Sequence, residues 1–326
     1  MDEKNVLEIR DLHTSFFTEK GVVRAVNGVD LNVPEGKIIG LVGESGCGKS
    51  MTARSVMGLV RYPGKVESGS IRLDGKELTG LKDQDLREVC GNDVSMIFQE
   101  PMTSLNPVLR VGHQVEESLL VHHKVNSRKE AKQEVIEMFN HVGIPEAEQR
   151  YSCYPHELSG GLRQRVMIAM AMICEPRLLI ADEPTTALDV TVEAQILRLM
   201  KELCEEHGMS VLLITHNLGV VAEICDEVYV MYAGRIVEHA SVFSLFDHTS
   251  HPYTKGLLSS IPRIGKNPEY LHTIPGIVPN LLHLPEGCPF STRCDLASER
   301  CRKELPELNA VGENHECRCF EAIKEG

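Results

Sequence analysis

The sequence lacks several features that mark whole classes of protein. No apolar run approaches the roughly 20 residues that cross a bilayer, since the clean apolar run at 166–174 has only nine residues. No charged-then-apolar leader opens the chain, so we expect no secretion. Acidic residues outnumber basic ones, and the resulting formal net charge of −13 argues against nucleic-acid binding. Neither an internal repeat nor a low-complexity segment is visible. If the protein works at a membrane, it must dock onto embedded partners.

What is present is typical of a globular protein. The chain has 326 residues, of which 42% are hydrophobic and 25% are charged. This length is sufficient for two domains and a large core.

Residues 43–50, with the sequence GESGCGKS, fit the phosphate-binding pattern G-x-x-x-x-G-K-[ST]. The apolar run 37–42 predicts a buried strand before the loop, and 50–59 predicts a helix after it. Glycines let backbone N–H groups turn toward phosphate oxygens, and the helix N-terminus adds its positive dipole end. We therefore expect nucleotide binding, with Mg²⁺, by Gly43, Glu44, Ser45, Gly46, Cys47, Gly48, Lys49, Ser50 and Met51.

Two residues of this loop have specific expected roles, and a third has two interpretations. Lys49 would bridge the β- and γ-phosphates of ATP, and the Ser50 hydroxyl would ligate Mg²⁺. The helix N-terminus would lower the thiol pKa of Cys47 and make it oxidisable. Alternatively, Cys47 is only a tolerated small residue.

Three polar positions further along the chain follow apolar strands. Asp182 and Glu183 end the apolar run that starts at residue 178. Gln99 directly follows the apolar residues 96–98, and His216 directly follows the expected strand 210–215. Ligands bind at the carboxyl ends of strands in α/β sheets. Asp182 is then placed to hold the magnesium shell, and Glu183 to polarise an attacking water.

Ser159, Gly160 and Gly161 precede a helical run at 163–174. Free N–H groups at this helix start predict a second phosphate contact. A plain N-cap at Ser159 is the other interpretation, and the two roles are compatible.

The remaining pattern outlines the fold. Residues 6–12 and 29–33 alternate like half-exposed antiparallel strands, and 70–76 predicts a strand that enters an Asp-Gly turn. Helices are expected at 116–123 and 128–141. A hairpin through Ala233 and Gly234, joining 227–231 to 235–238, is expected to end the core.

Together these elements resemble those of ABC ATPase subunits over roughly residues 5–240. The segment 158–165, LSGGLRQR, resembles the ABC signature, and 187–189 resembles the D-loop. The resemblance implies an α/β P-loop NTPase core: a mixed sheet, an antiparallel β subdomain and a helical subdomain inserted at about 104–175. It also implies head-to-tail dimers in which the signature of one subunit contacts ATP on the other.

The resemblance assigns the site residues by role. Catalysis is expected of Lys49, Gln99, Glu183 and His216, and magnesium binding of Ser50, Gln99 and Asp182. Nucleotide contacts are expected of Ser159, Gly160, Gly161 and Asp189. An adenine-stacking aromatic is expected at Phe16, with Phe17 as its competitor.

The tail resembles the C-terminal extension of ATPase subunits of oligopeptide/dipeptide importers. It contains HPYT at 251–254, a proline-rich path at 261–279, and GCPFSTRC at 287–294. The resemblance implies an ATPase that energises peptide import through a core at 1–240 and an extension at 241–326. Implied partners are a second ABC ATPase subunit, two transmembrane permeases and an extracytoplasmic peptide-binding protein, with this chain peripheral on the cytoplasmic face. Nickel-uptake subunits share much of the pattern, and a soluble ABC ATPase of DNA repair or translation is the remaining alternative.

Five of the eleven cysteines lie in the tail. Disulfides are disfavoured because the ATPase body implies a reducing cytoplasm. Zinc prefers Cys-x₂₋₄-Cys pairs, which the wide gaps between Cys288, Cys294 and Cys301 do not supply. Thiolates on irregular loops can hold an iron–sulfur cube, and the family resemblance implies a [4Fe–4S] cluster. The family places one ligand four residues after a histidine, and counting from His315 this position is Cys319. The expected ligands are therefore Cys288, Cys294, Cys301 and Cys319, and Cys317 is an extra thiol. A zinc site and thiols without a metal are the alternatives.

Overall fold

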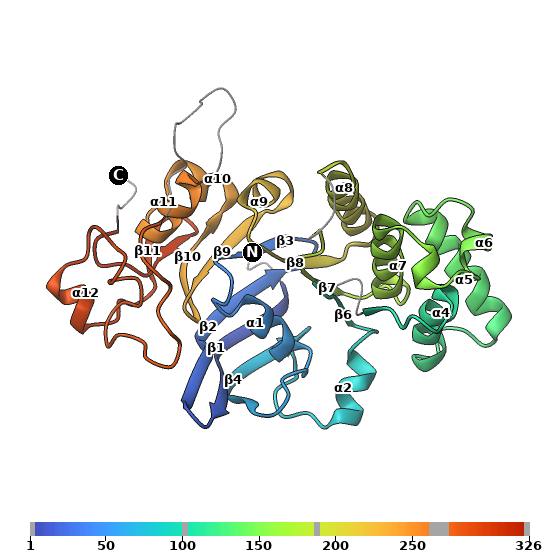
Figure 1. Ribbon diagram of the computed structural model, residues 1–326, viewed down its shortest axis with the longest axis horizontal. Coiled ribbons are helices and arrows are strands. Elements are labelled where there is room, and N and C mark those ends of the chain that lie inside the picture. Colours follow the sequence, from blue (N-terminus) through green and yellow to red (C-terminus); the bar gives the residue numbers. More distant parts are fainter. Residues whose placement is uncertain (1–3, 100–103, 186–189, 261–273, 323–326) are drawn as a thin grey trace. The chain divides into compact units, whose positions relative to one another are not determined.

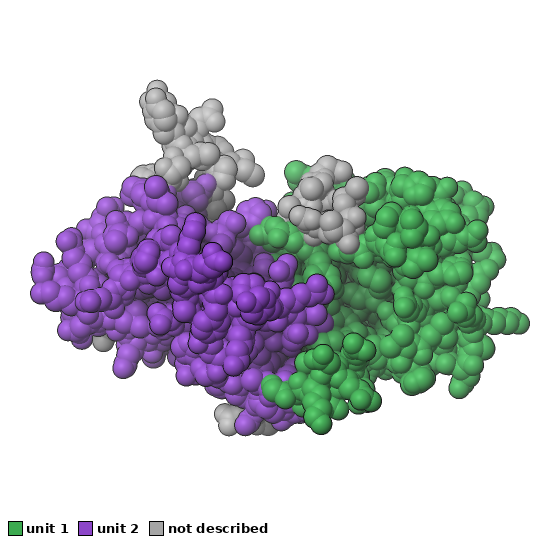
Figure 2. Space-filling model, turned by 60° about the horizontal axis from the view of Figure 1, so that its bottom comes forward, with its two compact units in different colours: residues 1–6, 34–37, 80–213 green, residues 7–33, 38–79, 214–326 purple. Residues whose placement is uncertain are grey.

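The structure is a computed structural model that describes residues 4–99, 104–185, 190–260 and 274–322. Its contacts divide the chain into two compact units, shown in Figure 2. Unit 1 comprises residues 1–6, 34–37 and 80–213, and unit 2 comprises residues 7–33, 38–79 and 214–326. Among the described residues, no helix combines the length and apolarity needed to cross a membrane.

Unit 2 contains a four-stranded sheet in the order β2-β1-β4-β5. Its strands are β1 (Asn5–Thr18), β2 (Gly21–Pro34), β4 (Gly64–Leu73) and β5 (Lys76–Glu77), and Figure 1 shows the first three beside α1 (Lys49–Val56). Strands β1 and β4 pair antiparallel, and β1 is twice the predicted length. Asp74 and Gly75 both adopt positive φ, 46° and 79°, which forms the predicted tight turn.

The second sheet segment of unit 2 has the order β11-β12-β10-β9-β3. The buried strand β3 (Ile38–Val42) runs parallel to β9 (Glu227–Tyr232), which pairs antiparallel with β10 (Arg235–Ser241). The prediction that this hairpin ends the core was wrong. The sheet continues through β12 (His315–Cys317), antiparallel to β10, and then β11 (Asn309–Gly312). Tail residues therefore complete the sheet that carries the phosphate loop.

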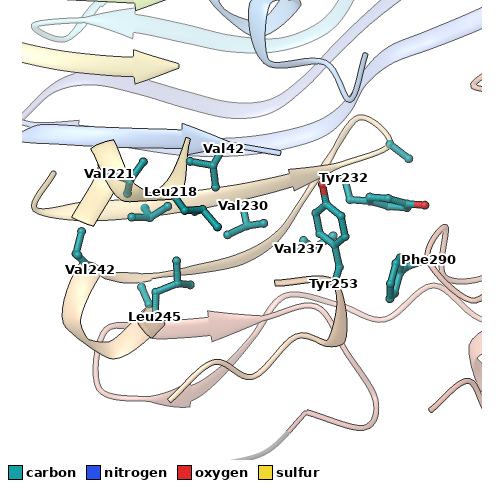
Figure 3. Close-up of a cluster of buried hydrophobic side chains, with 13 residues drawn as sticks. Val42, Leu218, Val221, Val230, Tyr232, Val237, Val242, Leu245, Tyr253 and Phe290 are labelled. Atoms are coloured by element: carbon teal, nitrogen blue, oxygen red, sulfur yellow. The ribbon is translucent and has the colours of Figure 1, made fainter. Parts of the chain in front are cut away.

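One apolar cluster joins this sheet to the helices of the extension (Figure 3). It packs α9 (Leu218–Ile224), α10 (Val242–Asp247) and α11 (Pro252–Ser259) against β9 and β10. At one end, the rings of Tyr232, Tyr253 and Phe290 contact one another with centroids 4.6–5.5 Å apart. These aromatic contacts fix the start of α11 and the segment near Phe290 against the end of β9.

A fully buried carboxylate ties three segments of the tail together. Glu238 of β10 accepts hydrogen bonds from the backbone N–H groups of Ser250 and His251, at 2.6 and 3.2 Å. The Nε2 atom of His315, also fully buried, lies 2.9 Å from the same carboxylate. A buried charge is tolerated only where such partners compensate its lost hydration. Glu238 therefore anchors both the entry to α11 and strand β12.

Unit 1 contains β6 (Val94–Ile97), β7 (Leu178–Asp182) and most of β8 (Ser210–Thr215). Strands β6 and β7 pair in parallel and are buried throughout, as expected where helices cover both faces of a sheet. Its helices are α2 (Asp83–Val89), α4 (Val111–Val121), α5 (Arg128–His141), α6 (Ala147–Arg150), η1 (Pro155–Glu157), α7 (Gly160–Met172) and α8 (Val190–His207). Helix α5 has the predicted bounds, whereas α4 starts five residues before the predicted 116.

We predict that Glu238→Ala destabilises unit 2 by at least about 3 kcal/mol. The substitution leaves several buried hydrogen-bond donors without an acceptor, and each unsatisfied donor costs about 1–3 kcal/mol. Urea unfolding followed by circular dichroism would measure the loss. The control is Glu316→Ala on β12, whose carboxylate is 45% exposed and pairs with His239. Such a partly exposed pair should contribute less than about 1 kcal/mol, so equal losses for the two variants would contradict the anchoring role of Glu238.

Candidate nucleotide-binding site

The predicted phosphate loop lies in unit 2, between β3 and α1, with its backbone pressed against other backbone. A Cβ atom on Gly43 would lie 2.2 Å from the carbonyl oxygen of Met231, and one on Gly48 would lie 2.3 Å from that of Ala25. Both glycines also have positive φ, 153° and 114°. Only glycine permits this approach and this backbone conformation together.

The turn between β9 and β10 supports the loop from one side. Gly234 donates its N–H to the carbonyl of Cys47 at 2.8 Å, and Asn27 donates to the carbonyl of Gly234 at 2.8 Å. The loop is therefore bonded to the hairpin turn, which is bonded in turn to β2. This chain of hydrogen bonds holds the loop in one conformation.

Lys49 points back over the loop. Its side chain is buried, and Nζ donates to the carbonyls of Gly43 at 2.7 Å and Glu44 at 3.0 Å. The ammonium group is thus held at the centre of the loop, the position that a phosphate-binding lysine requires.

Of the two interpretations of Cys47, the structure supports the tolerated small residue. Its side chain is 1% exposed, and burial raises the thiol pKa, more than the nearby Lys49 ammonium lowers it. The thiol therefore stays protonated and packs as a small apolar group.

Helix α1 begins without a side-chain cap. Its N-cap is Gly48, which has a left-handed backbone and makes no capping hydrogen bond. The helix N-terminus is left with N–H groups that no cap side chain satisfies, which favours an anion at this position. Ser50, half-buried in the first turn, lies beside this opening.

The two aromatic candidates differ in exposure. Phe16 is half-buried in β1 and faces Gly64 of β4, where an added Cβ would lie 2.7 Å from its ring. Phe17 is 47% exposed. The assignment of adenine stacking to one of them stays a prediction.

Unit 1 brings two of the predicted catalytic residues together at the carboxyl ends of β6 and β7. Gln99 donates from Nε2 to Oε2 of Glu183 at 2.9 Å, across 84 residues of sequence. Asp182 is 2% exposed at the end of β7, and Glu183 has a positive φ of 48°. A non-glycine residue in this region is strained, and such strain gathers at functional sites. Gln164 of α7 holds the next residue by donating to the carbonyl of Pro184.

The start of α7 has the predicted cap. The Ser159 hydroxyl accepts a hydrogen bond from the N–H of Leu162 at 3.3 Å. No atom of the described residues lies within 4 Å of a Cβ built on Gly160, whereas one on Gly161 would touch Val192. The exposed glycine leaves room for a ligand at this helix start.

His216 lies in unit 2, immediately after β8, and is exposed. The next residue, Asn217, caps α9 by accepting from the N–H of Gly219 at 3.0 Å. The predicted D-loop residue Asp189 lies outside the described residues. Lys49 and His216 thus belong to unit 2, whereas Gln99, Asp182 and Glu183 belong to unit 1.

Sequence reasoning missed the residues of the extension that touch the phosphate loop. The N–H of Glu44 donates to Oη of Tyr253 at 2.8 Å, and the Glu44 carboxylate pairs with Arg293. Tyr253 and Arg293 stand within the two tail motifs, HPYT and GCPFSTRC, which were the available signal.

The four cysteines predicted as ligands line one pocket of unit 2. Besides Cys288, Cys294, Cys301 and Cys319, the lining includes the apolar side chains of Phe290, Leu296 and Phe320. Cys317 is not part of this lining and instead lines a second pocket, to which Cys319 also contributes. Burial, and then the three neighbouring sulfurs, raise the pKa of Cys319 to about 11. Among the described residues, no three of these sulfurs lie within 4.8 Å of one another. The four sulfurs line the same pocket, but they are farther apart than four sulfurs bound to one zinc ion, where each Zn–S bond is about 2.3 Å.

Comparisons with known proteins agree with this geometry. Residues 26–186 match the family described as ABC transporter, and residues 237–301 match the oligopeptide/dipeptide transporter C-terminal region. A dimeric structure of the bacterial ABC transporter cassette MJ0796 has a TM-score of 0.66 and 26% identity, covering 72% of this chain and 98% of that one. CbiO1 from Clostridium perfringens has a TM-score of 0.63 and 27% identity, covering 75% and 91%. The fold is thus an ABC ATPase cassette with a mixed sheet, as predicted.

Two curated relatives define the branch. The oligopeptide transport ATP-binding protein AppD of Bacillus subtilis is 52% identical over 98% of both chains. The oligopeptide transport ATP-binding protein OppD of Haemophilus influenzae is 52% identical over 97% of both. The chain therefore belongs to the ABC transporter family, among the ATP-binding proteins with the oligopeptide/dipeptide C-terminal region.

We predict that Gly48→Ala destabilises unit 2 by more than about 2 kcal/mol, because the new methyl group would clash with the Ala25 carbonyl in a strained backbone. Gly46→Ala is the matched control, since Gly46 also has positive φ (78°), but a Cβ built on it meets no atom within 4 Å in the part of the chain that the structure describes. Gly46→Ala should lower the free energy of unfolding by only about 1 kcal/mol. Thermal and urea unfolding would measure the stability of both variants. Equal losses of stability would refute the close approach of the loop backbone to the Ala25 carbonyl.

Proposed function

We propose that this chain is the ATP-hydrolysing subunit of a peptide importer. The observation that carries the proposal is the phosphate loop, in which buried Lys49 is centred over a fixed backbone and α1 opens without a cap. This arrangement provides the cation, the N–H groups and the helix dipole that a triphosphate needs. The ABC family membership supports the same ligand.

The proposed roles are those that the resemblance to ABC ATPases assigns. Lys49 bridges the β- and γ-phosphates, the Ser50 hydroxyl and Asp182 bind Mg²⁺, and Glu183 orients and polarises the attacking water. The hydrogen bond from Gln99 to Glu183 supports this last role, because it holds the carboxylate in one orientation and couples it to the segment after β6. His216 contacts the γ-phosphate.

Two such cassettes bind ATP between them head to tail. The uncrowded start of α7, with Ser159 as its cap and Gly160 exposed, suits a phosphate presented by a second subunit. Dimeric structures of the related cassette MJ0796, one of them described as a post-hydrolysis state with ADP and Pi, support this assembly. Closure on ATP and reopening after hydrolysis move the permease subunits at the cytoplasmic face of the membrane.

The transported class is short peptides delivered by an extracytoplasmic binding protein. The relatives named for oligopeptide, dipeptide and peptide transport support this class. They favour it over nickel uptake and over the repair or translation alternatives.

Cys288, Cys294, Cys301 and Cys319 would hold a [4Fe–4S] cluster. The donor set supports the proposal, because the four thiols line one pocket with apolar neighbours and are spaced more widely than one zinc ion requires. When bound, the cluster supplies iron–thiolate bonds that cross-link an irregular segment with little regular structure. The chain's own residues orient the thiols: Cys288 donates its N–H to the carbonyl of Cys301 at 2.8 Å.

We predict that Glu183→Gln lowers ATP turnover by at least about 100-fold, because the amide cannot act as a general base. ATP binding should persist, since the neutral side chain keeps its size. Phosphate release and binding of a fluorescent ATP analogue would be measured on the same preparations. Glu202→Gln, an exposed change on α8, is the control and should match the wild type. A Glu183→Gln chain that hydrolyses ATP at the normal rate would sink the assigned role.

We predict that serine at any of Cys288, Cys294, Cys301 or Cys319 lowers bound iron and acid-labile sulfide in anaerobically purified protein. Removing one thiolate removes one iron ligand. Cys317→Ser is the control and should keep the wild-type iron content, because Cys317 lies outside the pocket. Stoichiometric zinc without iron in the wild type would overturn the cluster assignment.

A further inference from the structure

The phosphate loop carries an acidic residue that is held by the extension. Arg293 donates from Nη1 to Oε2 of Glu44 at 2.7 Å and from Nη2 to Oε1 at 3.1 Å. This two-pronged contact joins residues 249 positions apart, and both belong to unit 2. Two parallel charge-assisted hydrogen bonds fix direction as well as distance.

The guanidinium has no freedom to take another position. Its other hydrogen bonds go from Nη1 to Oη of Tyr232 (3.4 Å), from Nη2 to the carbonyl of Ile274 (3.3 Å), and from Nε to the carbonyl of Pro275 (3.0 Å). All five N–H donors of the group are therefore used. The side chain is 3% exposed, and the bond to Glu44 raises the pKa of Arg293 above its usual value.

The backbone of Glu44 is held from the same side. Its N–H donates to Oη of Tyr253, which is fixed by the aromatic contacts with Tyr232 and Phe290. The extension thus binds both the amide and the carboxylate of one loop residue. These contacts determine where the carboxylate points.

A carboxylate in a phosphate-binding loop is electrostatically unfavourable. Glu44 lies between Gly43 and the glycines that shape the loop, and its negative charge repels a triphosphate. The repulsion is small only while a cation compensates the charge and holds the side chain in place. In this structure that cation is Arg293.

We propose that Arg293 is a positioning residue of the nucleotide site, which neutralises and holds Glu44 so that ATP affinity depends on the docked extension. The inference rests on the proposed function, because it concerns the same nucleotide. Arg293 acts through Glu44 and does not itself contact the phosphates. Loss of its contact leaves an uncompensated carboxylate in the loop.

The test measures the dissociation constants of MgATP, MgADP and adenosine for the wild type and four variants in the full chain. Arg293→Met should weaken MgATP binding at least tenfold, MgADP binding less, and adenosine binding not at all, because the repulsion scales with ligand charge. The double variant with Glu44→Gln should recover most of the lost ATP affinity, since it removes the unpaired charge. Arg302→Met, an exposed arginine of α12 (Glu299–Lys303), is the control and should match the wild type.

A purely structural role would give another pattern. Arg293→Met would then weaken the binding of all three ligands alike, and the double variant would still bind ATP weakly. This result would overturn the proposal. Glu44→Gln alone tests it without changing the sequence of the extension: its ATP affinity should exceed that of the wild type, because the Arg293 cation is then uncompensated beside the loop, and a loss of more than threefold would contradict the proposal. If the wild type itself fails to bind MgATP, the proposed function is wrong. If the wild type and Arg293→Met bind it equally, only this inference is wrong.

Discussion

Unit 2 is organised around the close approach of the phosphate loop to neighbouring backbone. Gly43 and Gly48 lie where any Cβ atom would enter the carbonyls of Met231 and Ala25. This contact ties β2, β9 and the loop into one body, and it centres the Lys49 ammonium over the loop carbonyls. Because the backbone is already held, little conformational entropy is lost when a ligand binds.

The extension is part of this body. Strand β12 adds to the edge of β10, and the buried Glu238 carboxylate binds the chain at the entry to α11 and at His315. From α11, Tyr253 reaches the loop amide of Glu44. A continuous series of hydrogen bonds thus runs from the tail strands to the nucleotide loop.

Local patterns in the sequence were sufficient for much of the fold. Helix α5, the Ser159 cap and the Asp74 turn were predicted because each depends on neighbouring residues. Strand β12 was missed because three residues, His-Glu-Cys, carry no periodicity. The pairing of Arg293 with Glu44 was missed because its partners are far apart in sequence and each is an unremarkable charged residue alone. The thiol pKa of Cys47 depends on burial, which the motif does not encode.

The proposed function requires ATP to join two cassettes before it is hydrolysed. The most direct measurement is sedimentation of the Glu183→Gln chain, alone and with its natural partner ATPase, in MgATP and in MgADP. The account predicts a dimer in MgATP that dissociates in MgADP, because only the γ-phosphate completes the contact between subunits. A monomer at all concentrations in MgATP, with the partner present, would contradict it.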